Sequence, residues 1–529
     1  MLRRFNTAGP CDPQRHYMIP AEQRLPQAEG LVEQLGYFVV HAPRQTGKTT
    51  ALRGLTARLN ATGRHAAVMI SCEEGRSAGD DYVAVQRMLV SQLMQQAEAT
   101  LPSAQCPSMV EAVVEERLLG VFLARWASSC PLPLALVFDE IDSLRGASLL
   151  NVLSQLRAGF AERPGRFPAS VVLCGLRDVR DYKAASGGDP SRLGTSSPFN
   201  IKLKSLRVGD FSEAEVRSLF EQHTTETGQI VDEPAFDRMM EATAGQPWLV
   251  NALGNELIEE MSVPLSEPLT AQLVDDARER LILARATHLD SLVARLDEPR
   301  VRRIIEPILA GTFLGGDDPY DDDLQYCRDL GLITQANPIA VANSIYREVI
   351  VRVLAGRVES QVLAEPRSFV LPDGRLDFPR VLREFAEFWR EHGEILTRSQ
   401  VWHETAPQLV LMAFLQRVVN GGGFIDREYG IGRGRIDLLV RWPYRDEQGR
   451  RVVQREALEL EVWAKGPRDP LDKGLQQLDG YLQRLGLDSG VLVIFDRRPE
   501  AGEAGQMDER TRFEAARTEA GRAVTVLRG

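Results

Sequence analysis

The feature that most constrains this chain is the segment HAPRQTGKTT (residues 41–50), which matches the pattern GxxxxGK[ST] at every defined position except the first. We predict a strand before it, at residues 37–40, and a helix directly after it. This order brings backbone N–H groups and a helix N-terminus together around a phosphate. Ala42 replaces the first glycine, which costs little if its φ stays negative. The segment therefore predicts a parallel α/β nucleotide-binding core.

Within this segment, two side chains are expected to act on the nucleotide directly. Lys48 should reach the β- and γ-phosphates as a point charge, and the Thr49 hydroxyl should hold Mg²⁺. Only six of the 63 basic residues are lysines, so a lysine at this position is informative. The other residues expected to surround the nucleotide here are Ala42, Pro43, Arg44, Gln45, Thr46, Gly47 and Thr50.

A second acidic motif supports the same site. The segment LALVFDEIDSL (residues 134–144) reads as a buried strand that ends in two carboxylates. Asp139 is expected to bind Mg²⁺ through water, and Glu140 to polarise the attacking water as a general base. Because the sequence has no NKxD motif for guanine, ATP is favoured over GTP.

The next predicted strand, in SVVLCGLRDVRDY (residues 170–182), ends near Arg177. ATPases of this kind place a polar sensor of the γ-phosphate there, so Arg177 is a candidate sensor, with Arg180 a weaker one. An exposed position in an arginine-rich chain explains Arg177 equally well.

Length and hydrophobic patterning predict four domains. At 529 residues the chain is too long for one core. Apolar runs at 66–71, 133–138, 170–175 and 199–203 alternate with helical patterns at 81–97, 109–126 and 147–161, which is typical of a parallel sheet covered on both faces. The predicted domains are a P-loop core (1–210), a helical lid (211–285) that begins with a capping box at Ser212, a winged helix (286–360), a linker with a helix (361–394) and a last α/β domain (395–529).

Composition limits the other function classes. The net charge of −11, most of it in the first 360 residues, argues against a surface coated with positive charge. Six scattered cysteines without a CxxC pair favour reduced thiols, with no disulfide or zinc site. No apolar run approaches the ~18 residues of a membrane span, and none follows the charged N-terminus as in a signal peptide. We therefore expect a cytoplasmic chain that does not associate with membranes.

Taken together, HAPRQTGKTT, VFDE and GQPWLVNAL resemble the AAA+ ATPases of the STAND and archaeal-ATPase type, close to the origin-recognition branch. The resemblance covers residues 1–360 and implies ATP and Mg²⁺ as cofactors. It also implies that Gly245 and Pro247 lie against the adenine ring, with Trp248 as packing, and that residues 16–20 (HYMIP) form the other side of that pocket. Such ATPases form homo-oligomers through an arginine finger; Arg192 lies in the right interval, but nothing local singles it out.

The order of elements predicted over residues 395–500, a helix, a hairpin, a strand, a helix and a strand, resembles the PD-(D/E)XK nuclease fold. The resemblance implies that Glu404, Asp437 and Glu459 bind Mg²⁺ or Mn²⁺ and activate water for phosphodiester cleavage. Gln477 and Tyr481 match the Q-x-x-x-Y accessory motif of the RecB-like members. Four arginines near Asp437 favour contact with nucleic acid, and DNA is the expected partner: Arg427, Arg433, Arg435 and Arg441.

One residue departs from the nuclease pattern. Glu461 stands where the family has a lysine, and a carboxylate there repels phosphate. Lys465, six residues after Glu459 on the same predicted strand, or Lys473 could substitute for the missing cation. Two hypotheses stay open: an ATP-dependent switch coupled to a nuclease-like domain, suited to genome defence, mobile-element control or repair, and an ATP-gated scaffold whose last domain only binds DNA or a protein partner.

Overall fold

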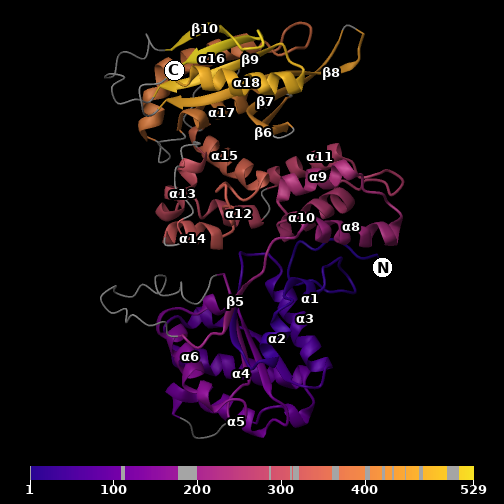
Figure 1. Cartoon of the computed structure of the whole chain (residues 1–529), viewed down its shortest axis with the longest axis vertical. Helices are drawn as coiled ribbons and strands as arrows, with labels where there is room; N and C mark the ends of the chain where they lie inside the picture. Colours follow the sequence, from indigo (N-terminus) through magenta and orange to yellow (C-terminus); the bar gives the residue numbers. More distant parts are fainter. Residues whose placement is uncertain are drawn as a thin grey trace. The chain divides into compact units, whose positions relative to one another are not determined.

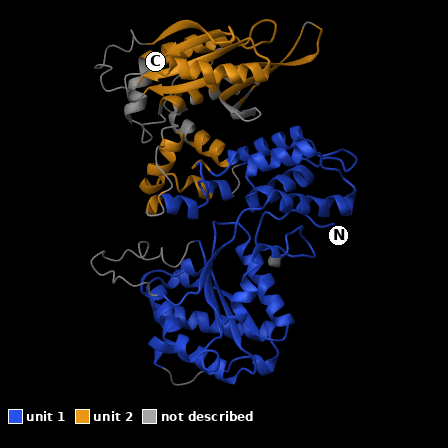
Figure 2. Cartoon of the chain, in the orientation of Figure 1, with its two compact units in different colours: residues 1–290, 324–338, 342–345 blue, residues 291–323, 339–341, 346–529 orange. Residues whose placement is uncertain are grey.

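The structure is a computed structural model of the chain (Figure 1). It describes residues 2–108, 114–176, 199–284, 287–309, 313, 318, 321–359, 369–399, 406–419, 423–431, 434–446, 448–463, 469–496 and 511–529. The chain forms two compact units, coloured separately in Figure 2. Unit 1 consists of residues 1–290, 324–338 and 342–345, and unit 2 of residues 291–323, 339–341 and 346–529.

Unit 1 contains a five-stranded parallel sheet with the strand order β2-β3-β4-β1-β5. Its strands are β1 (Tyr37–His41), β2 (Ala66–Ser71), β3 (Leu134–Asp139), β4 (Ser170–Gly175) and β5 (Lys204–Arg207). The α/β core predicted from the sequence is thus confirmed, and the first four strands lie within one residue of their predicted bounds. The prediction of a strand at 199–203 is wrong, because β5 begins at Lys204. As an edge strand with an exposed end, β5 buries only Leu206 and so lacks the apolar run that identifies the inner strands.

Helices cover both faces of this sheet (Figure 1). On one face Leu136 and Phe138 pack with α4 (Tyr82–Thr100), α5 (Leu118–Ser129) and α6 (Gly146–Ala158). On the other, Val40 and Val137 pack with α2 (Ala28–Glu33) and α3 (Lys48–Ala61), which follow the short α1 (Ala21–Arg24). Burial on both faces explains why the inner strands are apolar throughout. The helix predicted at 109–126 begins only at Leu118, after a 3-10 turn at Glu115–Arg117, and residues 109–113 lie outside the described part.

The rest of unit 1 is mainly helical. It comprises α8 (Glu213–Thr227), α9 (Glu233–Thr243), α10 (Pro247–Asn255), a π-helical turn (Glu256–Glu260) and α11 (Ala271–Leu283). The predicted capping box is present: Ser212 Oγ accepts from the Glu215 N–H, and the Glu215 carboxylate accepts from the Ser212 N–H. This pairing satisfies two of the donors that a helix start leaves without partners.

Residues 287–359 form the helices α12 (Thr287–Val293), α13 (Pro299–Leu309), α14 (Asp322–Asp329) and α15 (Ser344–Glu359). Between α14 and α15 the chain folds back, and the Ala342 N–H donates to the Leu332 carbonyl at 2.9 Å. Helices followed by a short hairpin and a helix are the order expected of a winged helix. That domain assignment, and the four-domain division as a whole, stay predictions.

Unit 2 contains a six-stranded mixed sheet with the order β10-β11-β9-β8-β7-β6. Its strands are β6 (Phe424–Ile431), β7 (Gly434–Arg445), β8 (Arg451–Trp463), β9 (Ser489–Asp496), β10 (Arg512–Arg517) and β11 (Ala523–Arg528). β6, β7 and β8 pair antiparallel, whereas β9 is parallel to both β8 and β11. A second α/β domain with this element order agrees with the sequence, although β10 and β11 were not predicted. Its likeness to a nuclease fold stays a prediction.

Three helices flank the second sheet. The crossover helix α18 (Leu471–Leu485) packs Leu478 and Leu482 against one face. α16 (Phe378–Ser399) and α17 (Ala406–Val419) supply the rings of Phe385 and Phe414, and Phe385 also contacts Phe495 of β9. Side chains alternate along a strand, so α18 and this aromatic cluster lie on opposite faces of the sheet. In the described part of the chain, no helix is long and apolar enough to cross a membrane.

Candidate nucleotide site and acidic site

The phosphate loop joins the end of β1 to the start of α3, as the sequence predicted. α3 begins at Lys48, and Gly47 before it has a φ of +85°. Glycine adopts this left-handed conformation without strain, which explains its presence at the last turn before the helix. Ala42 is fully buried and is not one of the residues with positive φ, so an alanine is tolerated there.

The Lys48 side chain folds back onto the backbone of the phosphate loop. Its ammonium donates to the carbonyl oxygens of Ala42 at 2.9 Å and of Pro43 at 2.8 Å. The Thr46 hydroxyl donates to the same Pro43 carbonyl at 2.9 Å. Lys48 is buried, so its charge lies inside the cradle formed by the loop backbone. Phosphate oxygens that enter this cradle would compete with the two carbonyls for the ammonium.

The residues predicted to hold Mg²⁺ are in contact. Thr49 Oγ1 donates to Asp139 Oδ2 at 2.7 Å, which joins the start of α3 to the end of β3. Asp139 is 3% exposed, and its other oxygen accepts from the Glu140 N–H at 3.0 Å. A hydroxyl and a carboxylate at the mouth of a phosphate loop are the oxygen ligands that Mg²⁺ prefers, so these residues fit the ion.

Glu140 follows directly and has a left-handed backbone, with φ at +54°. Burial, and then the charges of Asp142 and Asp139, raise the pKa of its carboxyl group, while Lys48 lowers it. An αL backbone at a non-glycine residue is costly and tends to occur where function fixes a side chain. A carboxylate with a raised pKa beside the phosphate loop is suited to accept a proton from water.

A cavity opens beside the loop. Its walls include Gln45 and Gly47 of the loop, Met18 and Ile19 of the HYMIP segment, and Pro247 and Trp248 of α10. The segments expected on the two sides of an adenine ring thus line one cavity. Gly245 does not line it: with φ at +76°, a Cβ there would lie 1.9 Å from the Phe211 carbonyl oxygen. Gly245 is therefore required because its backbone lies too close to that of Phe211 for any side chain.

Residues 6–11 of the N-terminal segment also belong to this site, whereas the resemblance had implied only residues 16–20. Thr7 and Cys11 line the same cavity. The Thr7 carbonyl accepts from Trp248 Nε1 at 2.9 Å, and the Cys11 N–H donates to Thr50 Oγ1 at 3.0 Å. The only signal in the sequence was a phenylalanine in a polar, Pro- and Gly-containing stretch: Phe5 is buried.

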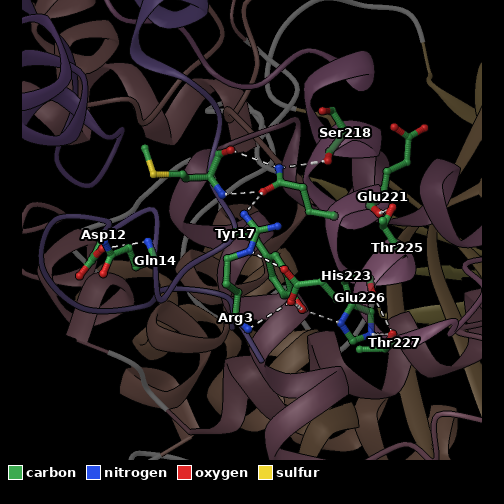
Figure 3. Close-up of polar contacts among 12 residues, drawn as sticks. Arg3, Asp12, Gln14, Tyr17, Ser218, Glu221, His223, Thr225, Glu226 and Thr227 are labelled. Carbon is green, nitrogen blue, oxygen red and sulfur yellow. Dashed lines mark hydrogen bonds and ion pairs between the residues drawn. The ribbon is translucent and has the colours of Figure 1, made fainter. Parts of the chain in front are cut away.

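Residues 2–19, which include this segment, also contact helix α8, as Figure 3 shows for Arg3 and Tyr17. Arg3 Nε pairs with Glu226 Oε1 at 2.6 Å, and the Tyr17 hydroxyl contacts His223 Nδ1 at 3.2 Å and Glu226 Oε2 at 3.3 Å. Burial and the Glu226 charge raise the pKa of Tyr17 to about 12, so its hydroxyl stays protonated as a donor. We call residues 2–19 the N-terminal strap, because it contacts both α8 and the start of α3.

Several predicted residues of this site fall outside the described part of the chain. They are the candidate sensors Arg177 and Arg180 and the candidate arginine finger Arg192. Arg44 is described and exposed.

The acidic residues predicted for the last domain lie on neighbouring strands. Glu459 and Glu461, two apart on β8, share one face. β7 and β8 pair Leu438 with Leu458, so the same register places Asp437 across from Glu459. The Leu460 N–H donates to Asp437 Oδ2 at 2.8 Å. These contacts put two carboxylates next to each other in the interior of the domain.

Glu459 is the most buried of these acids, at 3% exposure. Its Oε2 has no hydrogen-bond donor among the described residues. Burial, and then the charges of Asp437 and Glu461, raise the pKa of Glu459 to about 9. A buried carboxylate without a donor is unfavourable unless a proton or a cation accompanies it.

Among the described residues, the lysine beside these acids is Lys473, from α18. Its ammonium lies 2.8 Å and 3.1 Å from the two carboxylate oxygens of Glu461, which is 9% exposed. Lys465, the other lysine that the sequence suggested for this role, lies outside the described residues. A lysine four residues beyond the acids on the same strand was the simpler reading of the sequence, because the position of a crossover helix is decided by tertiary packing.

The remaining predicted residues are only partly placed. Glu404 and Arg433 lie outside the described residues. Arg427 lies on β6, opposite Leu438; Arg435 and Arg441 lie on β7; and Gln477 and Tyr481 lie on α18. Within the described residues, no group of three or more His, Cys, Asp and Glu side chains is arranged to hold a metal ion.

A match to a protein family supports the first site. Residues 33–182 match the family described as AAA domain. The solved structures similar to this chain include the Walker-type ATPase PABY2304 of Pyrococcus abyssi, at 14% identity and a TM-score of 0.47, over 65% of this chain and 99% of that one. The RuvB Holliday junction branch migration motor of Thermotoga maritima matches at 14% identity and a TM-score of 0.34, over 62% and 92%. Cdc6p of Pyrobaculum aerophilum matches at 13% identity and a TM-score of 0.34, over 63% of this chain and 94% of that one. No curated protein matches.

The AAA-domain match and the phosphate-loop geometry together define a P-loop ATPase domain of the AAA type. The chain is therefore an ATP-hydrolysing enzyme, and this family uses ATP with Mg²⁺.

Proposed function

We propose that this protein is an ATP-driven switch whose nucleotide state controls a nuclease-like domain that acts on nucleic acid. The observation that carries the proposal is the presence of two separate buried acidic sites in one chain. The contact between Thr49 and Asp139 supports ATP hydrolysis, and the pairing of Asp437 with Glu459 supports metal-dependent chemistry on a phosphodiester. The proposed roles are genome defence, mobile-element control or repair.

In the ATPase site, the residues divide the work. Lys48 and the backbone of residues 42–50 bind the phosphates, and Thr49 and Asp139 hold the Mg²⁺ that offsets phosphate charge. Glu140 takes the proton of the attacking water. Arg177 is proposed as the γ-phosphate sensor, and Pro247, next to Gly245, faces the base.

The lid and the winged helix, residues 211–285 and 286–360, are proposed to transmit the nucleotide state. The strap supports this proposal, because one segment contacts α3, α8 and α10 in unit 1. A nucleotide that binds the closed arrangement more tightly shifts the population toward it. Assembly into a homo-oligomer is part of the proposal.

In the last domain, residues 395–529, Glu404, Asp437 and Glu459 are proposed to hold Mg²⁺ or Mn²⁺. The carboxylates of Asp437 and Glu459 fit such an ion, because Glu459 is buried with an oxygen that has no donor in the described part of the chain. The metal would polarise the phosphate and activate water. DNA is the proposed substrate. Its phosphates are assigned to Arg427, Arg433, Arg435, Arg441, Gln477 and Tyr481, and the cation beside the acids to Lys473 or Lys465.

A second candidate function is an ATP-gated scaffold that holds DNA or a protein partner and cleaves nothing. Glu461 favours it, because a buried carboxylate occupies the position where the nuclease pattern has lysine.

Two assays test the proposal. Purified protein is incubated with radiolabelled DNA or RNA and Mn²⁺, with and without ATP, and wild type is compared with Asp437→Ala. Cleavage by wild type that is lost in Asp437→Ala supports the nuclease activity. If no condition gives cleavage, the scaffold function is supported instead. In parallel, Lys48→Ala is expected to abolish ATP hydrolysis. If that variant hydrolyses ATP at the wild-type rate, the proposed switch is wrong.

A further inference from the structure

In the described part of the last domain, two buried oxygen atoms lack a hydrogen-bond donor. Glu459 Oε2 and Gln477 Oε1 are both acceptors, and neither has a hydrogen-bond donor among the described residues. A buried acceptor without a donor costs about 1–3 kcal/mol. Two such atoms close together would share one cause, since a single cation can satisfy both.

The fold brings these two residues to the same level. β8 and β9 are parallel, and α18 connects them, so α18 runs antiparallel to β8. The contact of Lys473 with Glu461 fixes the alignment of helix and strand. From Lys473 to Gln477 the helix advances about 6 Å, and from Glu461 back to Glu459 the strand advances about 6.6 Å. This alignment places Gln477 at the level of Glu459 along the strand.

The charges around this position favour a divalent cation. Lys473 pairs with Glu461, so its ammonium is directed to that acid rather than to Glu459. The candidate ligands are two carboxylates and an amide oxygen, all hard donors, as Mg²⁺ and Mn²⁺ prefer. With only two acids next to each other, such a site would not form a cluster of three or more acids.

We propose that Gln477 completes, with Asp437 and Glu459, a site for one Mg²⁺ or Mn²⁺ ion, and that Glu461 is no ligand but holds Lys473 at the edge of this site. The inference rests on the proposed role of Asp437 and Glu459 and assigns Gln477 a different role from phosphate contact. It also explains the departure at Glu461: the acid on the strand anchors a lysine that the helix supplies.

The test measures Mn²⁺ binding rather than cleavage. The full-length protein, free of nucleotide, is titrated with Mn²⁺, and the free ion is followed by electron paramagnetic resonance. Asp437→Ala should lack this site, so the Mn²⁺ that it still binds measures binding elsewhere on the protein. Gln477→Leu is expected to raise the Kd for Mn²⁺ about tenfold or more. The matched control is Gln476→Leu, which changes an exposed glutamine on the same helix and should leave the Kd unchanged.

A second variant tests the role of Glu461. Glu461→Gln removes the charge that holds Lys473 but keeps the shape of the side chain. It should leave the Kd for Mn²⁺ within about threefold of wild type, because Glu461 is not a ligand and its ion pair involves the exposed Lys473. A loss as large as that of Asp437→Ala would show that Glu461 binds the ion and would overturn the assignment.

The outcomes separate this inference from the proposed function. If Asp437→Ala loses Mn²⁺ but Gln477→Leu binds like Gln476→Leu, the inference is wrong and the metal site stands. If wild type and Asp437→Ala bind Mn²⁺ equally, both are wrong. If Mn²⁺ binds as expected but no nucleic acid is cleaved, the inference stands and only the nuclease activity is refuted.

Discussion

At the scale of single residues, Gly245 illustrates what a backbone contact demands. A Cβ at this position would lie 1.9 Å from the Phe211 carbonyl oxygen, whereas a Cβ at Gly228, with nearly the same φ, would meet nothing within 4 Å. Gly228→Ala should therefore cost about 1 kcal/mol of stability through its positive φ alone. Gly245→Ala should cost about 1–3 kcal/mol more, because the added methyl group has no room. Denaturant unfolding of the two variants measures the difference, and equal losses would contradict the observed packing.

His288 gives a prediction about pH. Its ring packs against Trp248 at a tilt of 34°, with centroids 4.8 Å apart, and burial lowers its pKa to about 4. The unfolded chain, with an ordinary pKa near 6.5, binds a proton that the folded protein rejects. The stability from this site is therefore present above pH 6.5 and is lost as the pH falls from 6.5 to 4, by at most about 3 kcal/mol. His288→Leu should reduce the drop in melting temperature between pH 7.5 and pH 5; an unchanged drop would show that other groups cause it.

At the scale of elements, the strap is held mainly by apolar packing. Phe5 is buried against Tyr17 and Phe220, with ring centroids 5.1 Å and 4.6 Å away. The ion pair of Arg3 with Glu226 is partly exposed, at 28% and 26%, and such pairs contribute about 0–1 kcal/mol. Truncating a buried phenylalanine costs about 3–5 kcal/mol.

Phe5→Ala should therefore release the strap, and Arg3→Ala should not. Because the strap lines the nucleotide cavity, Phe5→Ala is expected to weaken the binding of a fluorescent ATP analogue at least tenfold, while Arg3→Ala changes it less than threefold. Hydrogen exchange of residues 2–19 reports whether the strap was released. If the strap is released and the affinity for ATP does not change, the strap does not contribute to nucleotide binding.

At the scale of the whole molecule, the proposed switch requires the two sites to be coupled. Glu140→Gln should bind ATP but hydrolyse it at least 100-fold more slowly, which holds the protein in its ATP state. If nucleotide controls the last domain, this variant should differ from Lys48→Ala in its affinity for DNA by about fivefold or more. Linkage is reciprocal, so DNA should change ATP affinity by the same factor. If the affinity for DNA does not depend on the nucleotide state, the two sites act independently and the proposed switch is wrong.

The nucleotide site was the part of this protein most accessible from sequence. Residues 41–50 and 134–144 are local patterns, in which a strand, a turn and a helix start follow one another, so the positions of Lys48, Thr49 and Asp139 could be predicted from spacing. The edge strand β5 was misplaced because half-exposed strands lack a continuous apolar run.

What tertiary structure alone decided are the contacts between segments far apart in the chain. The sequence does not indicate that residues 3–11 line the nucleotide cavity and contact α8, about 200 residues later, because this packing depends on Phe5 entering a core formed elsewhere. In the same way, the sequence determined that Glu461 lacks the usual lysine. Only the crossover of α18, which is fixed by the burial of Leu478 and Leu482 on the sheet, brought Lys473 to that carboxylate. Spacing along the chain determines local geometry, whereas hydrophobic packing determines which distant residues meet.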